Sequence, residues 1–207
     1  MDSVRKSAST VTLAAGDILF SQGEDAHSFF IVEQGEIEIS IYSSDGRKMI
    51  LDYRTPREIM GEIGFYSGVR SASAEAIGPA RLLQVRRPDL LETMRKDAEL
   101  AVQFIDILCA RLLASSDRIK QRFFDPLPAR LARTILHLDA KLAGRDGLIH
   151  ISQAELGDFT GASREGVAKI LQEWRDQDWI GLSRRTVSVT NRPALEILRD
   201  RPSPLHA

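Results

Sequence analysis

The chain has 207 residues, 43% of them hydrophobic and 28% charged, which is enough for one large or two small domains with packed cores. Its 28 Lys and Arg against 29 Asp and Glu give a net charge of −1, which excludes a uniformly basic nucleic-acid coat protein. The single cysteine, Cys109, excludes an intrachain disulfide, a four-thiolate zinc site and an iron–sulfur cluster. The chain contains no run of about 18 apolar residues and no apolar signal segment, so we expect a cytoplasmic protein without membrane contact.

The first part of the chain, residues 12–87, alternates short apolar runs with turn signals. Phe29 to Val32 is a continuous apolar run, and Glu36 to Ile41 alternates strictly between polar and apolar residues. Turn residues such as Ser44-Asp45-Gly46 separate these strand-like pieces. Short strands at this spacing predict an antiparallel sandwich or barrel. We expect it to form a domain over residues 1–87.

A long helix is predicted over residues 88–124, since Pro88 is followed by no further Pro or Gly in this stretch. Seven of its residues are spaced alternately three and four apart, as in the heptad seam between two paired helices. We interpret them as the interface of a homodimer; the alternative is a long helix packed on its own domain. This heptad seam consists of Val102, Ile105, Cys109, Leu112, Ser116, Ile119 and Phe123.

The strongest pattern in the chain is a helix-turn-helix in the expected C-terminal domain, residues 125–207. Ser152 followed by Glu155 forms a capping box, which predicts the start of the first helix. Gly161 permits the tight turn, and Ser163 can cap the second helix. A capped helix, a glycine turn and a second capped helix with a buried face are typical of a DNA-binding helix-turn-helix.

The first turns of the second helix carry side chains that can recognise bases. Arg164 and Lys169 can donate to guanine O6 and N7, and Glu165 can accept from cytosine N4. The alternative is a solvated Glu–Lys pair on the helix surface. Because these residues lie on the face that enters the major groove in this motif, we expect base contacts.

A short hairpin is predicted after this helix, over residues 179–189, with Arg184 and Arg185 at its tip. Such a wing would contact DNA phosphates; the alternative is a solvated basic turn.

The two halves of the chain differ in charge. Residues 1–125 hold 16 Lys and Arg against 19 Asp and Glu, whereas residues 126–207 hold 12 against 10. The net charge therefore changes from −3 to +2, a sign that suits DNA contact in the C-terminal part.

A second pattern, in residues 59–74, indicates an anion site. Gly61 begins a predicted short helix whose free N–H groups can face an anion. Arg70 can pair bidentately with a phosphate and Ser71 can add a hydroxyl, whereas Glu62 suits a sugar hydroxyl as an acceptor. Anion donors beside one sugar acceptor favour a nucleotide. The alternative is an Arg70–Glu62 ion pair that stabilises a β-hairpin.

The sequence resembles the bacterial CRP/FNR family from about Thr12 to Val189. The resemblance rests on Gly61-Glu62 with Arg70-Ser71-Ala72, and on Ser163-Arg164-Glu165 with Lys169. It implies an α+β fold with an N-terminal antiparallel β-roll (the cyclic-nucleotide-binding jelly roll), a long dimerisation helix and a C-terminal winged helix-turn-helix. It also implies a transcription factor that is controlled by a ligand or by another signal.

By this resemblance, a cyclic nucleotide, either cyclic AMP or cyclic GMP, binds between the β-roll and the long helix. Glu62 would bind the ribose 2′-hydroxyl, while Arg70, Ser71 and the Ala72 backbone would hold the cyclic phosphate. Two departures from the family are a loop between Glu62 and Arg70 about one residue shorter, and Ala114-Ser115 where the family has Thr-Ser against adenine. The expected ligand residues are Gly61, Glu62, Ile63, Arg70, Ser71, Ala72 and Ser115.

The expected partners are palindromic double-stranded DNA, a second copy of the chain, and RNA polymerase, which some relatives contact through a loop that aligns with Gly144 to Gly147. We expect a hinge near Phe124 to Pro128.

No catalytic motif is present and the four histidines lack metal-ligand spacing, so we expect neither an enzyme nor a metal site. An alternative mode of control is the same DNA-binding dimer without a ligand, or under oxidation of Cys109. The expected DNA-binding residues are Ser152, Ser163, Arg164, Glu165, Lys169, Arg184 and Arg185.

Overall fold

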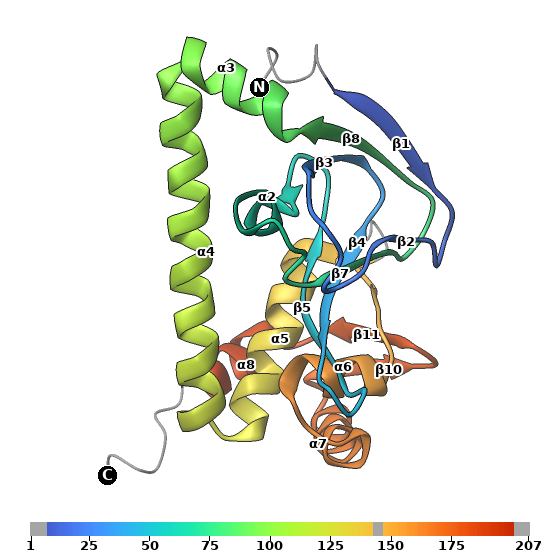
Figure 1. Ribbon diagram of the computed structural model, residues 1–207. Coiled ribbons are helices and arrows are strands. Elements are labelled where there is room, and N and C mark those ends of the chain that lie inside the picture. The colour runs from blue at the N-terminus through green and yellow to red at the C-terminus, as the bar shows by residue number, and fades with distance from the viewer. Residues whose placement is uncertain (1–7, 143–146, 201–207) are drawn as a thin grey trace. The chain divides into compact units, whose positions relative to one another are not determined.

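The computed structural model describes residues 8–142 and 147–200 (Figure 1). Contacts divide the chain into two compact units, Met1–Arg111 and Leu112–Ala207. The division falls inside one continuous helix. The expected domain boundaries after residues 87 and 124 stay predictions.

The first unit contains two four-stranded antiparallel sheets, which confirms the predicted β-roll. One sheet has the order β1-β8-β3-β6, with β1 Ser9–Leu13, β8 Ala80–Arg86, β3 Ser28–Gln34 and β6 Ile59–Met60. The other has the order β2-β7-β4-β5, with β2 Ile18–Phe20, β7 Ser73–Ala76, β4 Ile37–Tyr42 and β5 Lys48–Arg54. The core that these strands share includes Phe20, Phe30, Val32, Ile37, Met60, Ala74 and Leu82.

Strand β3 is buried on both faces, which explains its continuous apolar run. Phe30 and Val32 belong to the core of the β-roll, whereas Phe29 and Ile31 belong to a second core. Phe29 packs edge-on against Phe104, with ring centroids 5.6 Å apart. Alternate residues of one strand thus join the β-roll to the helices that cover it. The second core also contains Phe65, Leu83, Val85, Leu90 and Leu100.

Helices α2 Glu62–Ser67 and α3 Arg87–Lys96 complete this unit, together with the first part of α4 Ala98–Phe124. The prediction of one continuous helix from residue 88 to residue 124 is wrong at Asp97, whose backbone is extended at φ −137° and ψ 91°. The Asp97 N–H donates to Thr93 O, which ends α3, and its carboxylate accepts from Leu100 N, which starts α4. An aspartate cap therefore divides a stretch that Gly and Pro do not punctuate.

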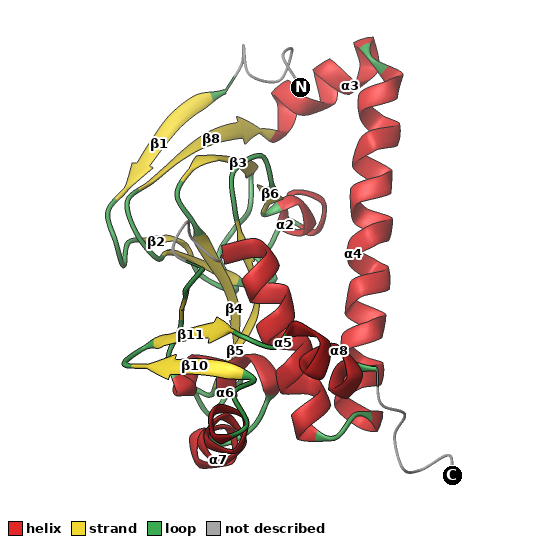
Figure 2. Ribbon diagram, turned by 180° about the vertical axis from the view of Figure 1, so that it is seen from behind, coloured by secondary structure: helices red, strands yellow, loops and turns green. Residues whose placement is uncertain are grey.

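The second unit is a winged helix-turn-helix, as predicted (Figure 2). Its three-stranded sheet has the order β10-β11-β9. The elements are α5 Leu127–Leu142, β9 Ile149–His150, α6 Gln153–Thr160, α7 Arg164–Asp176, β10 Ile180–Ser183, β11 Thr186–Val189 and α8 Arg192–Arg199. The core of this unit includes Leu131, Ile135, Leu138, Leu156, Val167, Leu171, Trp174 and Leu195.

Candidate functional site

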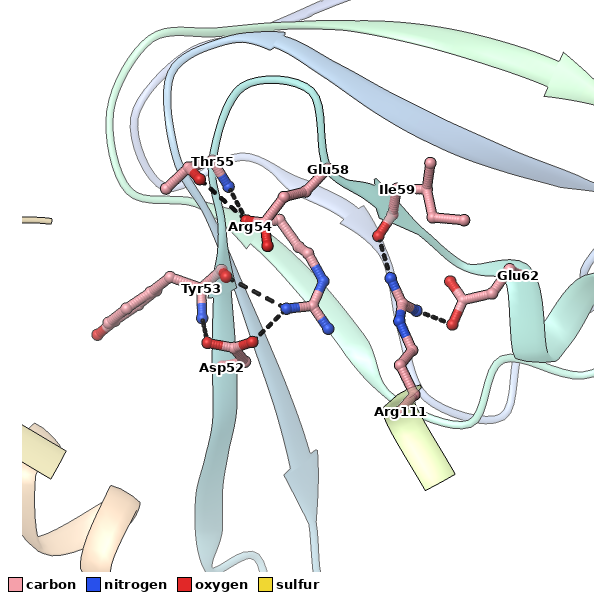
Figure 3. A network of polar contacts seen from close by, with 8 residues as sticks. All are labelled: Asp52, Tyr53, Arg54, Thr55, Glu58, Ile59, Glu62 and Arg111. Carbon is pink, nitrogen blue, oxygen red and sulfur yellow. Dashed lines mark hydrogen bonds and ion pairs between the residues drawn. The ribbon is translucent and has the colours of Figure 1, made fainter. Parts of the chain in front are cut away.

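Glu62 is the first residue of α2, which begins where Gly61 adopts the left-handed φ of 78°. The Glu62 residue is only 1% exposed, and its Oε1 forms an ion pair with Arg111 of α4 (Figure 3). Its Oε2 is also buried and has no hydrogen-bond partner among the described residues. A buried polar atom without a hydrogen-bond partner costs about 1–3 kcal/mol, and more when the group is charged, as a carboxylate is. The site therefore presents an acceptor that a hydroxyl or N–H group can satisfy.

Arg111 is a site residue that the sequence analysis missed. Its guanidinium donates to Ile59 O as well as pairing with Glu62 (Figure 3). Burial, followed by the nearby Arg54 charge, lowers the pKa of Arg111 to about 10, so it stays charged at neutral pH. Arg111 lies four residues before Ser115 on α4, hence on the same helix face, and this spacing was the available signal.

Polar residues of β5 and the following turn surround this ion pair (Figure 3). Arg54 pairs with Asp52, two residues earlier on β5. Glu58 accepts from the Thr55 N–H at 2.7 Å and from its hydroxyl at 2.9 Å. The charges of Glu58 and Asp52 raise the pKa of Arg111, against the larger lowering effect of burial. The Arg111 guanidinium, which pairs with Glu62, therefore lies near one positive charge, Arg54, and two negative charges, Glu58 and Asp52.

Arg70 is 5% exposed and directs its guanidinium into the β-roll. Its Nη1 donates to Ser28 O at 2.8 Å and to Gly61 O at 3.2 Å, and its Cζ lies 4.2 Å from the Phe20 ring centroid. Burial lowers the pKa of Arg70. Its Nε is buried with no hydrogen-bond partner among the described residues. Arg70 is held by backbone carbonyls and not by Glu62, so the alternative Arg70–Glu62 ion pair is wrong.

Gly61 is the point at which these two groups meet. A Cβ at Gly61 would lie 2.5 Å from Arg70 Nη1, so only glycine admits the guanidinium. Of the other expected ligand residues, Ser71 and Ile63 are exposed and Ala72 is buried in the β-roll core. Ser115 belongs to the second unit. The structure brings together Gly61, Glu62 and Arg70, and it leaves a donor and an acceptor of this group unsatisfied.

The heptad seam is exposed along its whole length in the single chain. The exposed fraction is 50% at Val102, 69% at Leu112 and 77% at Phe123. On another face of α4, Leu100 and Phe104 are buried in the second core. The helix therefore buries one apolar stripe in the first unit and presents a second one to solvent.

The caps and the turn of the helix-turn-helix confirm the local prediction. Ser152 and Glu155 exchange both hydrogen bonds of the capping box, at 3.2 Å and 2.7 Å. Gly161 ends α6 at φ 65° and ψ 38°, and Ser163 caps α7 by accepting from Gly166 N at 3.1 Å. These contacts are local in sequence, which is why the pattern predicts them.

The expected base-contacting residues Arg164, Glu165 and Lys169 are all exposed on the first turns of α7. Arg184 and Arg185 form the exposed two-residue turn between β10 and β11, as predicted. Arg185 adopts a left-handed backbone at φ 57° and lies 3.6 Å from the Glu155 carboxylate. Their contacts with DNA stay predictions. Among the described residues, no group of three His, Cys, Asp or Glu could hold a metal ion, and no helix could cross a membrane.

Residues 10–97 match the family model of the cyclic nucleotide-binding domain, and residues 129–198 match that of the Crp-like helix-turn-helix domain. The chain belongs to the CRP/FNR family. It is 27% identical over 192 residues to the CRP-like cAMP-activated global transcriptional regulator of Mycobacterium tuberculosis, covering 90% of this chain and 86% of that protein. It is 26% identical over 177 residues to the cAMP-activated global transcriptional regulator CRP of Escherichia coli, covering 83% and 84%.

Solved CRP/FNR-family structures share the fold. FixK2 from Bradyrhizobium japonicum superposes with a TM-score of 0.83 at 23% identity, covering 95% of this chain and 99% of that one. The c-di-GMP responsive global regulator CLP of Xanthomonas campestris gives 0.79 at 20% identity, covering 91% and 96%. The protein is therefore a DNA-binding transcription regulator with a cyclic-nucleotide-binding domain, and not an enzyme.

Proposed function

We propose that this CRP/FNR-family regulator is a homodimer that binds palindromic DNA under the control of a cyclic nucleotide, with cyclic AMP the first candidate and cyclic GMP the second. The observation that carries the effector class is the pair of unsatisfied buried atoms beside Gly61, the acceptor Oε2 of Glu62 and the donor Nε of Arg70. A cyclic nucleotide offers the matching groups, a ribose hydroxyl that donates and a phosphate that accepts. The cAMP-activated relatives support the same class.

In the proposed complex, Glu62 accepts the ribose 2′-hydroxyl at Oε2 and keeps Arg111 on Oε1, so that its charge stays balanced. Arg70 donates from Nε to the cyclic phosphate, and the exposed Ser71 hydroxyl adds a second donor. Ser115 contacts the base from α4, as the family resemblance implies. Because a ligand shifts only the states that it distinguishes, binding favours one arrangement of the two DNA-binding units.

Dimerisation is supported by the exposed heptad seam. Large apolar side chains such as Leu112 and Phe123 lose contact with water when two α4 helices pair, which stabilises association by about 25 cal/mol per Å² of buried apolar area. Cys109 is exposed on this seam, so two thiols would approach each other in a parallel dimer. Control by thiol oxidation at this position is the alternative mode.

In the proposed DNA complex, the two α7 helices enter successive major grooves about 34 Å apart. Arg164, Glu165 and Lys169 contact bases, while Arg184 and Arg185 of the wing contact phosphates.

A DNA-binding regulator must reach the chromosome, so we place it in the cytoplasm. RNA polymerase is the further proposed partner; residues 144–146 of the turn assigned to it lie outside the described residues.

Titration calorimetry with cyclic AMP, cyclic GMP and cyclic di-GMP tests the effector. We expect the wild-type protein to bind a cyclic mononucleotide. Glu62→Gln should weaken binding by roughly tenfold or more, because a charged acceptor becomes neutral, whereas Arg70→Ala should abolish it. Glu92→Gln, which neutralises an exposed carboxylate on α3, should bind as the wild type does.

Unchanged affinity in both Glu62→Gln and Arg70→Ala would remove Glu62 and Arg70 from the effector site. If none of the three nucleotides binds, control by a cyclic nucleotide is wrong. A dimer band on a non-reducing gel after oxidation would then favour control through Cys109.

A further inference from the structure

Two arginines tie the end of α4 and the start of α5 to the turn of the helix-turn-helix. Arg130 donates from Nε to Thr160 O at 3.2 Å and from Nη1 to Asp125 O at 2.7 Å. Thr160 is the last residue of α6, and Asp125 directly follows α4. Carbonyl groups at helix C-termini lack an intrahelical partner and carry partial negative charge, so one guanidinium satisfies the ends of two helices.

Arg122, in the last turn of α4, covers the next residue of the turn. A Cβ at Gly161 would lie 2.6 Å from Cζ, Nη1 and Nη2 of Arg122, so the planar guanidinium occupies the space that a side chain would fill. Gly161 thus meets two demands, a left-handed φ of 65° and close approach by this side chain. The two guanidiniums reach neighbouring residues of this turn, Thr160 and Gly161, and the Arg122 charge adds to burial in lowering the pKa of Arg130.

The segment in which we expected a hinge is held by further bonds. The Asp125 N–H donates to Gln121 O at 2.9 Å. Its carboxylate accepts from Arg133 at 3.3 Å, and the same Arg133 nitrogen donates to Arg199 O at 2.9 Å. The compact-unit division lies before this segment, at Leu112. The contacts therefore join the end of α4 to the DNA-binding unit.

We propose that Arg122 is a positioning residue for DNA recognition, which holds the turn between α6 and α7 against the last turn of α4. Arg122 adjoins Phe123, the last residue of the heptad seam. In the dimer of the proposed function, on which this inference rests, the end of the seam and each recognition helix then move as one body. The distance between the two recognition helices is consequently fixed, and the protein accepts one half-site spacing.

The test measures affinity for palindromes selected with the wild-type protein, with their centres shortened or lengthened by one base pair. Each change rotates one half-site by about 35° and shifts it by about 3.4 Å, which a rigid dimer cannot follow. We expect wild type to prefer one spacing, and Arg122→Ala to lose roughly fivefold or more of that preference. Arg122→Lys should resemble Arg122→Ala, because an ammonium cannot cover Gly161 as a planar group does.

The matched control is Lys120→Ala, which removes an equal charge from an exposed position on the same helix and should keep the preference. Emission from Trp174 and Trp179, the two tryptophans of the chain, verifies that each variant stays folded. An unchanged preference in Arg122→Ala or Arg122→Lys would overturn the proposal. Equal weakening at every spacing, with a smaller salt dependence than Lys120→Ala, would also overturn it and assign Arg122 a phosphate contact. Absence of any preference in wild type would overturn the proposed dimeric recognition itself, and the positioning role with it.

Discussion

Arg111 places its positive charge against a carboxylate that is almost completely shielded from water, and its spacing from Ser115 on α4 is the only sequence signal for this residue. Glu62 and Arg70 lie in one short cassette and were predicted as a site, but Arg111 comes from α4. Its partner is decided by how α4 packs on the β-roll, through residues such as Leu100 and Phe104. Sequence analysis therefore predicts the site residues that lie within one segment, and it misses Arg111, which reaches the site only through the packing of α4 on the β-roll.

Arg111→Ala should lower the free energy of unfolding by about 3 kcal/mol at pH 7, since it leaves the buried Glu62 carboxylate without a countercharge. The double variant Arg111→Ala, Glu62→Gln should recover much of this loss, because the buried charge is also removed. Urea unfolding measures both, with Lys120→Ala as an exposed control on the same helix. A loss below about 1 kcal/mol in the single variant would contradict the structural role of the pair.

Among the elements, those with local signals were predicted and those set by packing were not. The capping box at Ser152 and the cap at Ser163 lie within three residues of the groups they bind, so their helix starts were predicted correctly. Asp97 also caps a helix, but it interrupts a stretch of uniform helical propensity. The bend is stabilised because Leu90 of α3 and Leu100 of α4 enter the same core. This shared core forms only when both helices pack on the folded sheet, so the break between α3 and α4 is not visible in the local sequence.

Asp97→Ala should destabilise the protein by about 1 kcal/mol, because the N–H of Leu100 loses its side-chain acceptor. Urea unfolding followed by circular dichroism measures the change. Asp106→Ala, at an exposed position within α4, should stay within about 0.5 kcal/mol of wild type. Equal effects in the two variants would show that Asp97 contributes no cap.

At the scale of the whole molecule, the spacing of apolar residues along α4 predicts an exposed stripe, and the single chain has one. Periodicity identifies this face because one face of a helix repeats regularly, whatever covers it. The covering partner lies beyond the chain itself, so the homodimer stays a proposal.

Leu112→Glu should convert the proposed dimer to a monomer, because pairing of the two α4 helices would bury two like charges beside the dimer axis. It should also weaken binding to a palindrome far more than binding to a single half-site. Light scattering after gel filtration measures the mass. Ala110→Glu, an exposed position outside the heptad seam, should remain dimeric. A monomeric wild type at micromolar concentration would contradict the proposed assembly.

Arg185 has one more implication. The left-handed backbone of a non-glycine residue costs roughly 1–2 kcal/mol because of steric contacts of its Cβ. A glycine at this position of the two-residue turn would avoid that cost. Such outliers concentrate where a protein uses the side chain. The wing tip therefore carries a cationic side chain at a position where glycine would adopt the backbone conformation more easily.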